Sequence, residues 1–199
     1  MNFLAKVKVS SFKFQKNMII SEELKQNNIA EYIIYMWQTE DMLRTLDFDI
    51  EKIQEQIVDK YNIEDKVKLS IRKWYAGLIQ MAELENIKKV GHLQVFSNIV
   101  NDLNDLHLWL LNEASQTPYK QAYEVANPNI KALSGKMQNK LVNEIDICLH
   151  GLYAIMLLKL QNKEIHKDTL TAVDSFRKLI AILVSKYHDR EKHPEKYYK

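Results

Sequence analysis

The chain has 199 residues, of which 46% are hydrophobic and 27% are charged, a composition that suits one globular domain and excludes a disordered or fibrous protein. Only 4 glycines and 3 prolines are present, too few for an all-β fold that depends on many tight turns. The net charge of only +2 argues against nucleic-acid binding through phosphate neutralisation. The single cysteine, Cys148, excludes an intramolecular disulfide and a multi-cysteine metal site.

The first 17 residues differ from the rest of the chain. They carry four lysines and no acidic residue, so the remaining residues together are slightly acidic. This segment lacks the continuous apolar stretch and cleavage site of a secretory signal, and no run in the sequence approaches the ~18 apolar residues of a membrane span. We therefore predict a cytoplasmic protein with a flexible basic extension over 1–17, a single helical domain over 18–188 and a charged tail over 189–199.

Apolar residues recur every three or four positions from about residue 22 onward, a pattern typical of helices. Asp49 is placed to cap a short helix, and Asp168 or Thr169 to cap the last one. We expect Asn127–Pro128 to interrupt a helix, because proline lacks the backbone N–H that a helix needs. The expected helices cover about 24–46, 50–61, 64–85, 89–113, two short pieces within 119–138, 140–162, and 168 or 169 to about 188. Within 64–85 the predicted buried face comprises Val67, Ile71, Trp74, Leu78 and Met81.

These segments predict an all-α fold. Short connections favour antiparallel neighbours, so we expect an up-and-down bundle of four or five long antiparallel helices with shorter helices packed outside. The segment 140–162 is apolar on most sides, which is typical of a helix at the centre of a bundle.

Three stretches resemble a known family: NIAEYIIYMWQTEDMLR (28–44), GHLQVFSNIVNDLNDLHLWLL (91–111) and NEIDICLHGLYAIMLLKLQNKEI (143–165). The family is one of small bacterial helical proteins catalogued only as a domain of unknown function. The similarity covers about residues 18 to 188 and begins near Met18, which agrees with treating 1–17 as an extension. The resemblance implies a helical fold, and it implies no activity, substrate or catalytic residue.

Several kinds of helical enzyme need motifs that this sequence lacks. It contains no Glu-x-x-His of the ferritin-like di-metal sites, no His-Glu-x-x-His of the zinc proteases and no glycine-rich phosphate-binding loop. We therefore expect no cofactor and no metal, and we favour a protein that is not an enzyme.

Glu40 occupies a position where the apolar pattern of its helix predicts a hydrophobic residue, between Met36 and Leu43. An unpaired buried charge costs several kcal/mol, so Glu40 needs a partner. Our first hypothesis is a structural anchor that fixes the register of the helix. The candidate partners are Arg44, His107, Tyr35 and Trp37.

A second hypothesis gathers polar residues in one pocket between the first, fourth and sixth expected helices. Asp146 and His150 lie four residues apart, within reach of each other, so the carboxylate could orient the imidazole as a base or ligand. His107 falls inside the apolar arc of its helix, where a structural hydrogen bond is the alternative. The candidate pocket comprises Glu40, Arg44, His107, Asp146 and His150.

A candidate interaction surface lies on the polar side of the expected helix 89–113. Asp102 and Asp105 share this side with Trp109, and an exposed tryptophan beside acidic residues is a plausible contact point for another protein. The alternative for the acidic strip is an ordinary solvated face.

From these patterns we expect a non-catalytic helical bundle that acts through protein–protein contacts, as a homodimer or with an unknown protein partner, and that binds neither nucleic acid nor membrane. The alternative is a small-ligand or metal-binding protein, or an enzyme, that uses the candidate pocket. A third hypothesis is attachment to a membrane surface or nucleic acid through the basic extension 1–17.

Overall fold

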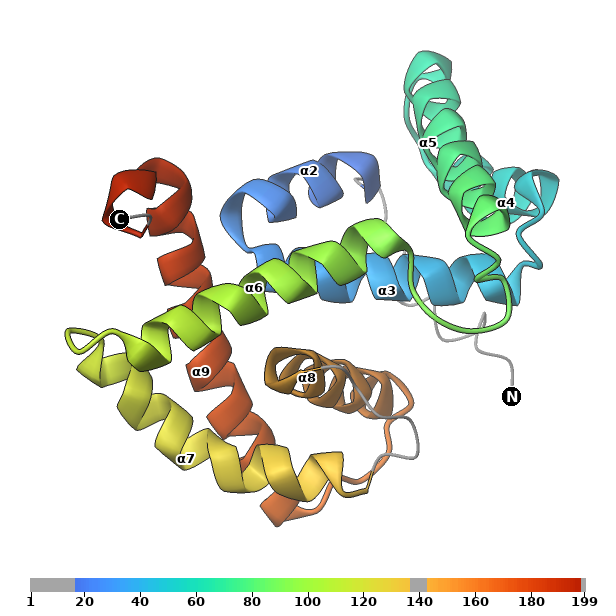
Figure 1. The fold of residues 1–199 in the computed structure, drawn as a ribbon. Helices are drawn as coiled ribbons and strands as arrows, with labels where there is room; N and C mark the ends of the chain where they lie inside the picture. Colours follow the sequence, from blue (N-terminus) through green and yellow to red (C-terminus); the bar gives the residue numbers. More distant parts are fainter. Residues whose placement is uncertain (1–16, 137–142, 198–199) are drawn as a thin grey trace. The chain divides into compact units, whose positions relative to one another are not determined.

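The computed structural model describes residues 17–136 and 143–197, and over these residues the protein consists of helices and their connections. The all-α prediction is confirmed, whereas the up-and-down arrangement of the long helices stays a prediction. The extension predicted over 1–17 lies, apart from Asn17, outside the described residues. The elements are α2 (Asn17–Asn27), α3 (Ile29–Thr45), α4 (Ile50–Gln56), the 3-10 helix η3 (Val58–Lys60), α5 (Asp65–Leu84), α6 (Gln94–Asn112), α7 (Thr117–Ser134), α8 (Glu144–Leu160), α9 (Lys167–Lys192) and the 3-10 helix η4 (Pro194–Lys196) (Figure 1).

The chain divides into two compact units, Met1–Ser97 and Asn98–Lys199. The single domain over 18–188 stays a prediction. Within the described residues, no helix is both long enough and apolar enough to cross a membrane.

In the first unit, the helix expected over 24–46 is divided at Asn28. This residue has an extended backbone (φ −154°), and its side chain accepts a hydrogen bond from the backbone N–H of Glu31 at 3.2 Å. Asparagine is among the preferred N-cap residues because its side-chain oxygen satisfies an otherwise unpaired N–H. Asn28 therefore begins α3 as a new helix, and α2 packs against it (Figure 1).

The end of α3 leads into the predicted cap at Asp49. Asp47 and Phe48 both have positive φ angles, which turn the chain, and the Asp49 carboxylate then accepts the N–H of Glu51 at 2.9 Å. The sequence predicts this cap correctly.

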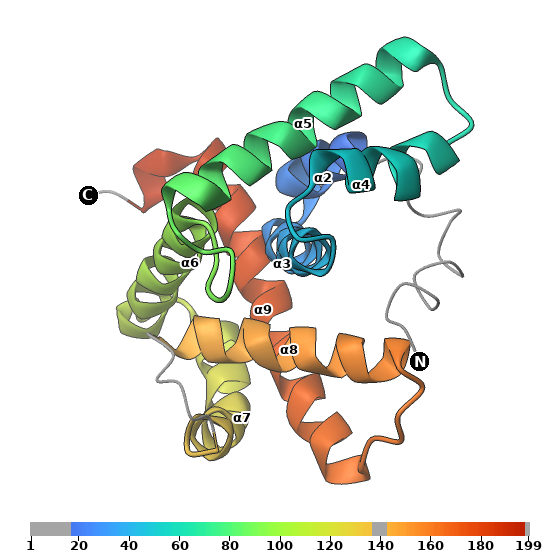
Figure 2. The ribbon, with the colours of Figure 1, turned by 90° about the vertical axis from the view of Figure 1, so that its right-hand side faces the viewer.

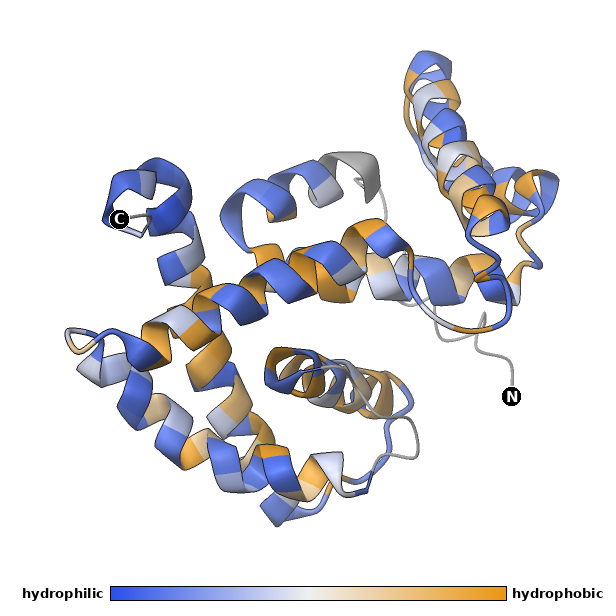
Figure 3. Cartoon of the chain, in the orientation of Figure 1, coloured by the Kyte–Doolittle hydropathy of each residue, from blue (hydrophilic) through white to orange (hydrophobic). Residues whose placement is uncertain are grey.

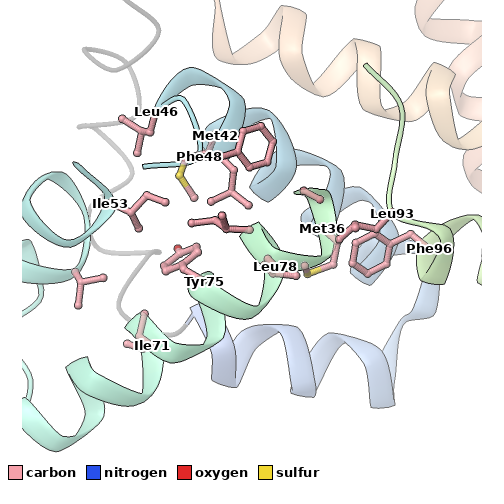
Figure 4. Close-up of a cluster of buried hydrophobic side chains, with 14 of the residues drawn as sticks. Met36, Met42, Leu46, Phe48, Ile53, Ile71, Tyr75, Leu78, Leu93 and Phe96 are labelled. Carbon is pink, nitrogen blue, oxygen red and sulfur yellow. The ribbon is translucent and has the colours of Figure 1, made fainter. Parts of the chain in front are cut away.

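The hydrophobic core of the first unit is formed by α3, α4, α5 and the residues around the start of α6. Figure 4 shows Met36, Phe48, Ile53 and Tyr75 among the side chains that meet there. The buried face of α5 is rotated relative to the predicted one, because Tyr75, Ile79 and Ala82 are buried while Met81 is 37% exposed. The side of α5 opposite this core is consequently left for other contacts.

In the second unit, α7 is one continuous helix that contains Pro128, so the predicted interruption is wrong. Proline leaves the carbonyl four residues earlier, that of Glu124, without its helical hydrogen bond. Both Glu124 and Pro128 are exposed, so water can satisfy that carbonyl, while Ala126 and Ile130 on the buried side hold the helix against its neighbours.

Helix α8 packs against α7 and α9 (Figure 2). It begins at Glu144, capped by the Asn143 side chain, and is buried on most sides of its first half, as its apolar sequence predicts. Gly151 permits this close packing, since a Cβ atom there would lie 3.0 Å from Cε2 of Phe176 and 3.1 Å from Cδ2 of Leu133.

Helix α9 differs from the prediction at both ends. Its cap is His166, whose side chain accepts the N–H of Asp168, rather than Asp168 or Thr169. It continues to Lys192 and is followed by η4, so most of the segment expected as a tail over 189–199 has regular structure.

Candidate functional site

Glu40 is buried on α3, with only 2% of its surface exposed, and it has the partner that burial of a charge requires. Its carboxylate accepts the backbone N–H of Leu93 at 2.9 Å and lies 2.5 Å from Nδ1 of His92. The His92 ring in turn stacks on Trp37, with ring centroids 4.5 Å apart. The carboxylate is thus bound by the stretch just before α6, 52 residues away, which was not among the expected partners.

Arg44, one turn further along α3, binds the same connection from the other side. Its Nη1 donates to Asp41 at 3.0 Å, and its Nη2 donates to the backbone carbonyls of Ile87, at 3.2 Å, and Gly91. Gly91 has φ of +95°, a conformation that favours glycine. Glu40 and Arg44 together fasten the α5–α6 connection to α3, which supports the structural-anchor hypothesis.

His107 is fully buried on α6 and links three helices of the second unit. Its Nδ1 lies 2.6 Å from the hydroxyl of Tyr119, and its Nε2 lies 3.2 Å from Glu144, which also accepts the hydroxyl of Tyr123 at 3.1 Å. A carboxylate can only accept, so Nε2 carries the proton and the Tyr119 hydroxyl donates to Nδ1. Burial lowers the pKa of His107 against the opposing effect of Glu144, and burial likewise raises the pKa of Tyr123 to about 12.

Asp146 and His150 form the contact that their spacing predicts. Nδ1 of His150 lies 3.0 Å from a carboxylate oxygen of Asp146, and both side chains are less than one-quarter exposed. Burial opposes the charge of His150, but the interactions with Asp146 outweigh it and raise the pKa of His150. Glu144, which sequence analysis did not select, is the acidic group that meets His107.

The five residues of the candidate pocket therefore belong to separate clusters of contacts. Glu40 and Arg44 lie in the first unit, and His107, Asp146 and His150 lie in the second. The convergence of all five in one pocket stays a prediction. A shallow depression of about 370 Å³ lies elsewhere, and it is lined by Gln54, Asp59, Asp65, Lys68, Leu69 and Arg72.

The candidate interaction surface on α6 is largely engaged by the end of the chain. Asp102 accepts a hydrogen bond at 2.5 Å from Arg190, whose side chain is buried. Trp109 is half-buried rather than exposed, and its ring lies 4.8 Å from that of Tyr197. Asp105 remains exposed, among the hydrophilic residues that alternate with hydrophobic ones along α6 (Figure 3).

A family model described as "Domain of unknown function (DUF4924)" matches residues 18–194. The chain belongs to this family. The match begins at Met18, as the resemblance predicts, and extends six residues past 188 to include Arg190. Comparisons with curated proteins and with solved structures find no match.

Glu40, Arg44, His107, Asp146 and His150 all lie within the family match. So does a surface that the sequence did not single out, the side of α5 turned away from the core. We call this the outer face of α5. It comprises Leu69, Lys73, Ala76, Gly77, Gln80, Met81 and Leu84.

The outer face of α5 carries apolar side chains in water. Leu69 is 53% exposed, Met81 37% and Leu84 75%. The helices α2 and α4 pack against α5, and Figure 2 shows them on the same side of it.

Gly77 is the helical residue at the middle of this face, and a Cβ atom added there would meet nothing within 4 Å. A glycine inside a helix costs about 1 kcal/mol relative to alanine, and no contact in the described residues explains its presence.

Proposed function

We propose that this protein is not an enzyme but acts by binding another protein chain, and that the outer face of α5 is the surface that binds. The observation that carries the proposal is the exposure of Leu69, Met81 and Leu84 along one side of a 20-residue helix. Leu69 lies at one end of this side and Met81 with Leu84 at the other, with the small residues Ala76 and Gly77 between them, and exposed apolar surface is typical of interaction sites.

The energetics favour a partner helix that covers both exposed leucines of this face. Burying one leucine side chain contributes about 1.5–3 kcal/mol, so covering Leu69 and Leu84 supplies a useful part of a binding free energy. The glycine between them lets a partner helix approach the α5 backbone closely. Lys73 and Gln80, on the same face, keep the uncovered helix soluble.

The anchoring contacts described above support this proposal indirectly. Glu40 and Arg44 fasten the connection that follows α5, through Leu93, Ile87 and Gly91. A helix whose C-terminal connection is held in this way presents its outer face in a fixed orientation, which lowers the entropic cost of binding.

The test is photo-crosslinking in cells that produce the full chain. A photoreactive amino acid replaces Leu84 in one variant and Leu160, which is 51% exposed on α8, in a matched control. We expect a crosslinked protein product from position 84 that exceeds any from position 160 and that disappears when Leu69→Lys is added. Equal yields from the two positions, or a yield that Leu69→Lys leaves unchanged, would overturn the proposal.

A further inference from the structure

The charges of α5 are uneven along the helix. The N-cap residue Glu64 and Asp65 in the first turn are acidic, as the helix dipole favours, but the charged residues that follow in the first half are all basic and the end of the helix is acidic. No charged residue separates Lys73 from Glu83. A helix carries partial positive charge at its N-terminus and partial negative charge at its C-terminus. Basic residues are therefore ordinarily favoured near the C-terminus of a helix, whereas those of α5 lie in its first half. The residues concerned are Lys66, Lys68, Arg72 and Lys73 at the basic end, and Glu83 with the C-cap residue Glu85 at the acidic end.

The residues of the outer face are symmetric in their spacing. Leu69 lies seven residues before Ala76, and Leu84 lies seven residues after Gly77. Lys73 and Gln80 are likewise each three residues from this central pair. The two smallest side chains of the face therefore lie midway between its two exposed leucines.

We infer that the partner of the outer face is α5 of a second copy of this chain, packed antiparallel about a two-fold axis between Ala76 and Gly77. This inference rests on the proposed function. In this arrangement each Leu69 meets Leu84 of the second copy, and the small central residues allow the two helices to cross closely. A two-fold interface must be self-complementary, and the symmetric spacing of the outer face meets this requirement.

Charge decides between antiparallel and parallel packing. In the antiparallel pair the end of each α5 with Lys66, Lys68, Arg72 and Lys73, which stays net positive when Glu64 and Asp65 are counted, faces the acidic end of the other, and the two helix dipoles oppose each other. A parallel pair would bring basic end against basic end. Charge complementarity therefore favours a second copy in the antiparallel orientation over an unrelated helix without these charges.

The interface is small. Helix α5 has 20 residues and is about 30 Å long, so the pairing of one face lies at the low end of the size range of protein interfaces. We expect a dissociation constant on the order of micromolar, and the experiments need protein at roughly 100 μM.

The register is tested with two full-length variants, Leu69→Cys and Leu84→Cys, prepared separately and then mixed under mild oxidation. We expect a disulfide-linked dimer from the mixture and little from either variant alone, since like positions lie about 22 Å apart along the pair. The native Cys148 is buried and burial raises its pKa, so the unmodified chain serves as the unreactive background. A mixture of Leu69→Cys with Leu160→Cys is the control for random collision.

The antiparallel arrangement would be overturned if either variant alone formed as much dimer as the mixture. The pairing itself would be overturned if the mixture formed no more dimer than the control. If photo-crosslinking at position 84 still yields a product with a different protein, the proposed function survives and only this inference fails.

A charge-reversal experiment does not depend on cysteine chemistry. Lys66→Glu with Lys73→Glu should weaken self-association at least fivefold by sedimentation equilibrium, and adding Glu83→Lys with Glu85→Lys to the same chain should restore it. Circular dichroism checks that each variant stays helical. Self-association that is unaffected by the first pair of substitutions would contradict the inference.

Discussion

At the scale of single residues, Glu40 shows what a sequence pattern can predict and what it cannot. The pattern placed a carboxylate at a buried position, and physical chemistry then required a partner for it. His92 and Leu93 provide that partner, but no local pattern pointed to them, because they approach α3 from a connection 52 and 53 residues away. The need for a partner was predictable from α3 alone, whereas its identity was not.

Replacing Glu40 should therefore destabilise the fold. Glu40→Gln removes one acceptor from a buried site that binds two donors, and it should lower the free energy of unfolding by about 1–3 kcal/mol. Glu31→Gln, at an exposed position on the same helix, is the control and should change it by less than about 0.5 kcal/mol. Urea unfolding of both variants measures the difference, and equal effects would show that Glu40 is not an anchor.

The two histidines of the second unit should respond to pH in opposite directions. The pKa of His107 is lowered below its ordinary value of 6.5, so its contribution to stability is full above about pH 6.5 and is lost as the pH falls toward the pKa of the folded protein. The pKa of His150 is raised, so its contribution is full below about pH 6.5 and is lost as the pH rises through the pKa of the folded protein.

Unfolding free energies measured from pH 5 to pH 8 test these signs. His107→Gln should reduce the loss of stability on acidification, and His150→Gln should increase it, each relative to the unsubstituted chain. A parallel change in both variants would show that the contacts with Glu144 and Asp146 do not control these groups.

At the scale of elements, helix boundaries followed local chemistry where a cap was strong and departed from it where packing prevailed. Asp49 caps α4 as predicted, since an aspartate cap acts within three residues. Pro128 does not interrupt α7, because Ala126 and Ile130 are buried against the rest of the unit. The buried face of α5 is rotated because the spacing of apolar residues alone does not tell which neighbours will cover them.

Two glycines at the middle of helices should give opposite results when replaced by alanine. Gly77→Ala should raise the free energy of unfolding by up to about 1 kcal/mol at low protein concentration, because the added methyl group meets open space and improves helix propensity. Gly151→Ala should lower it by about 1–3 kcal/mol, because the methyl group would press against Phe176 and Leu133. Thermal unfolding of the pair checks both signs, and a loss of stability in Gly77→Ala would contradict the open environment described here.

At the scale of the whole molecule, the family match and the helical class were both predictable, while the division of the chain was not. The end of the chain illustrates the difference. A charged sequence after residue 188 resembled a frayed tail, but Arg190 is buried beside Asp102, and Tyr197 packs against Trp109 while its hydroxyl donates to Asp189 at 2.9 Å.

A chain that ends at His188 should therefore be less stable than one that ends at Tyr197. The shorter chain loses the ion pair between the buried Arg190 and the half-exposed Asp102, and it loses the cover over Trp109, so we expect a loss of about 1–3 kcal/mol in unfolding free energy. Its tryptophan fluorescence should also shift to longer wavelength as Trp109 becomes exposed. Identical stability and spectra for the two chains would mean that residues 189–197 are a tail after all.

The sequence by itself determined that this chain is helical, where most of its helices lie, and that Glu40 could not be buried alone, because hydrophobic periodicity, capping and the cost of an isolated charge act over a few residues. Only the tertiary structure decided that His92 and Leu93 bind Glu40, that Glu144 meets His107, and that α5 turns Leu69 and Leu84 toward water. These outcomes depend on which distant segments share a core, and a pattern of spacing along one helix carries no information about its neighbours.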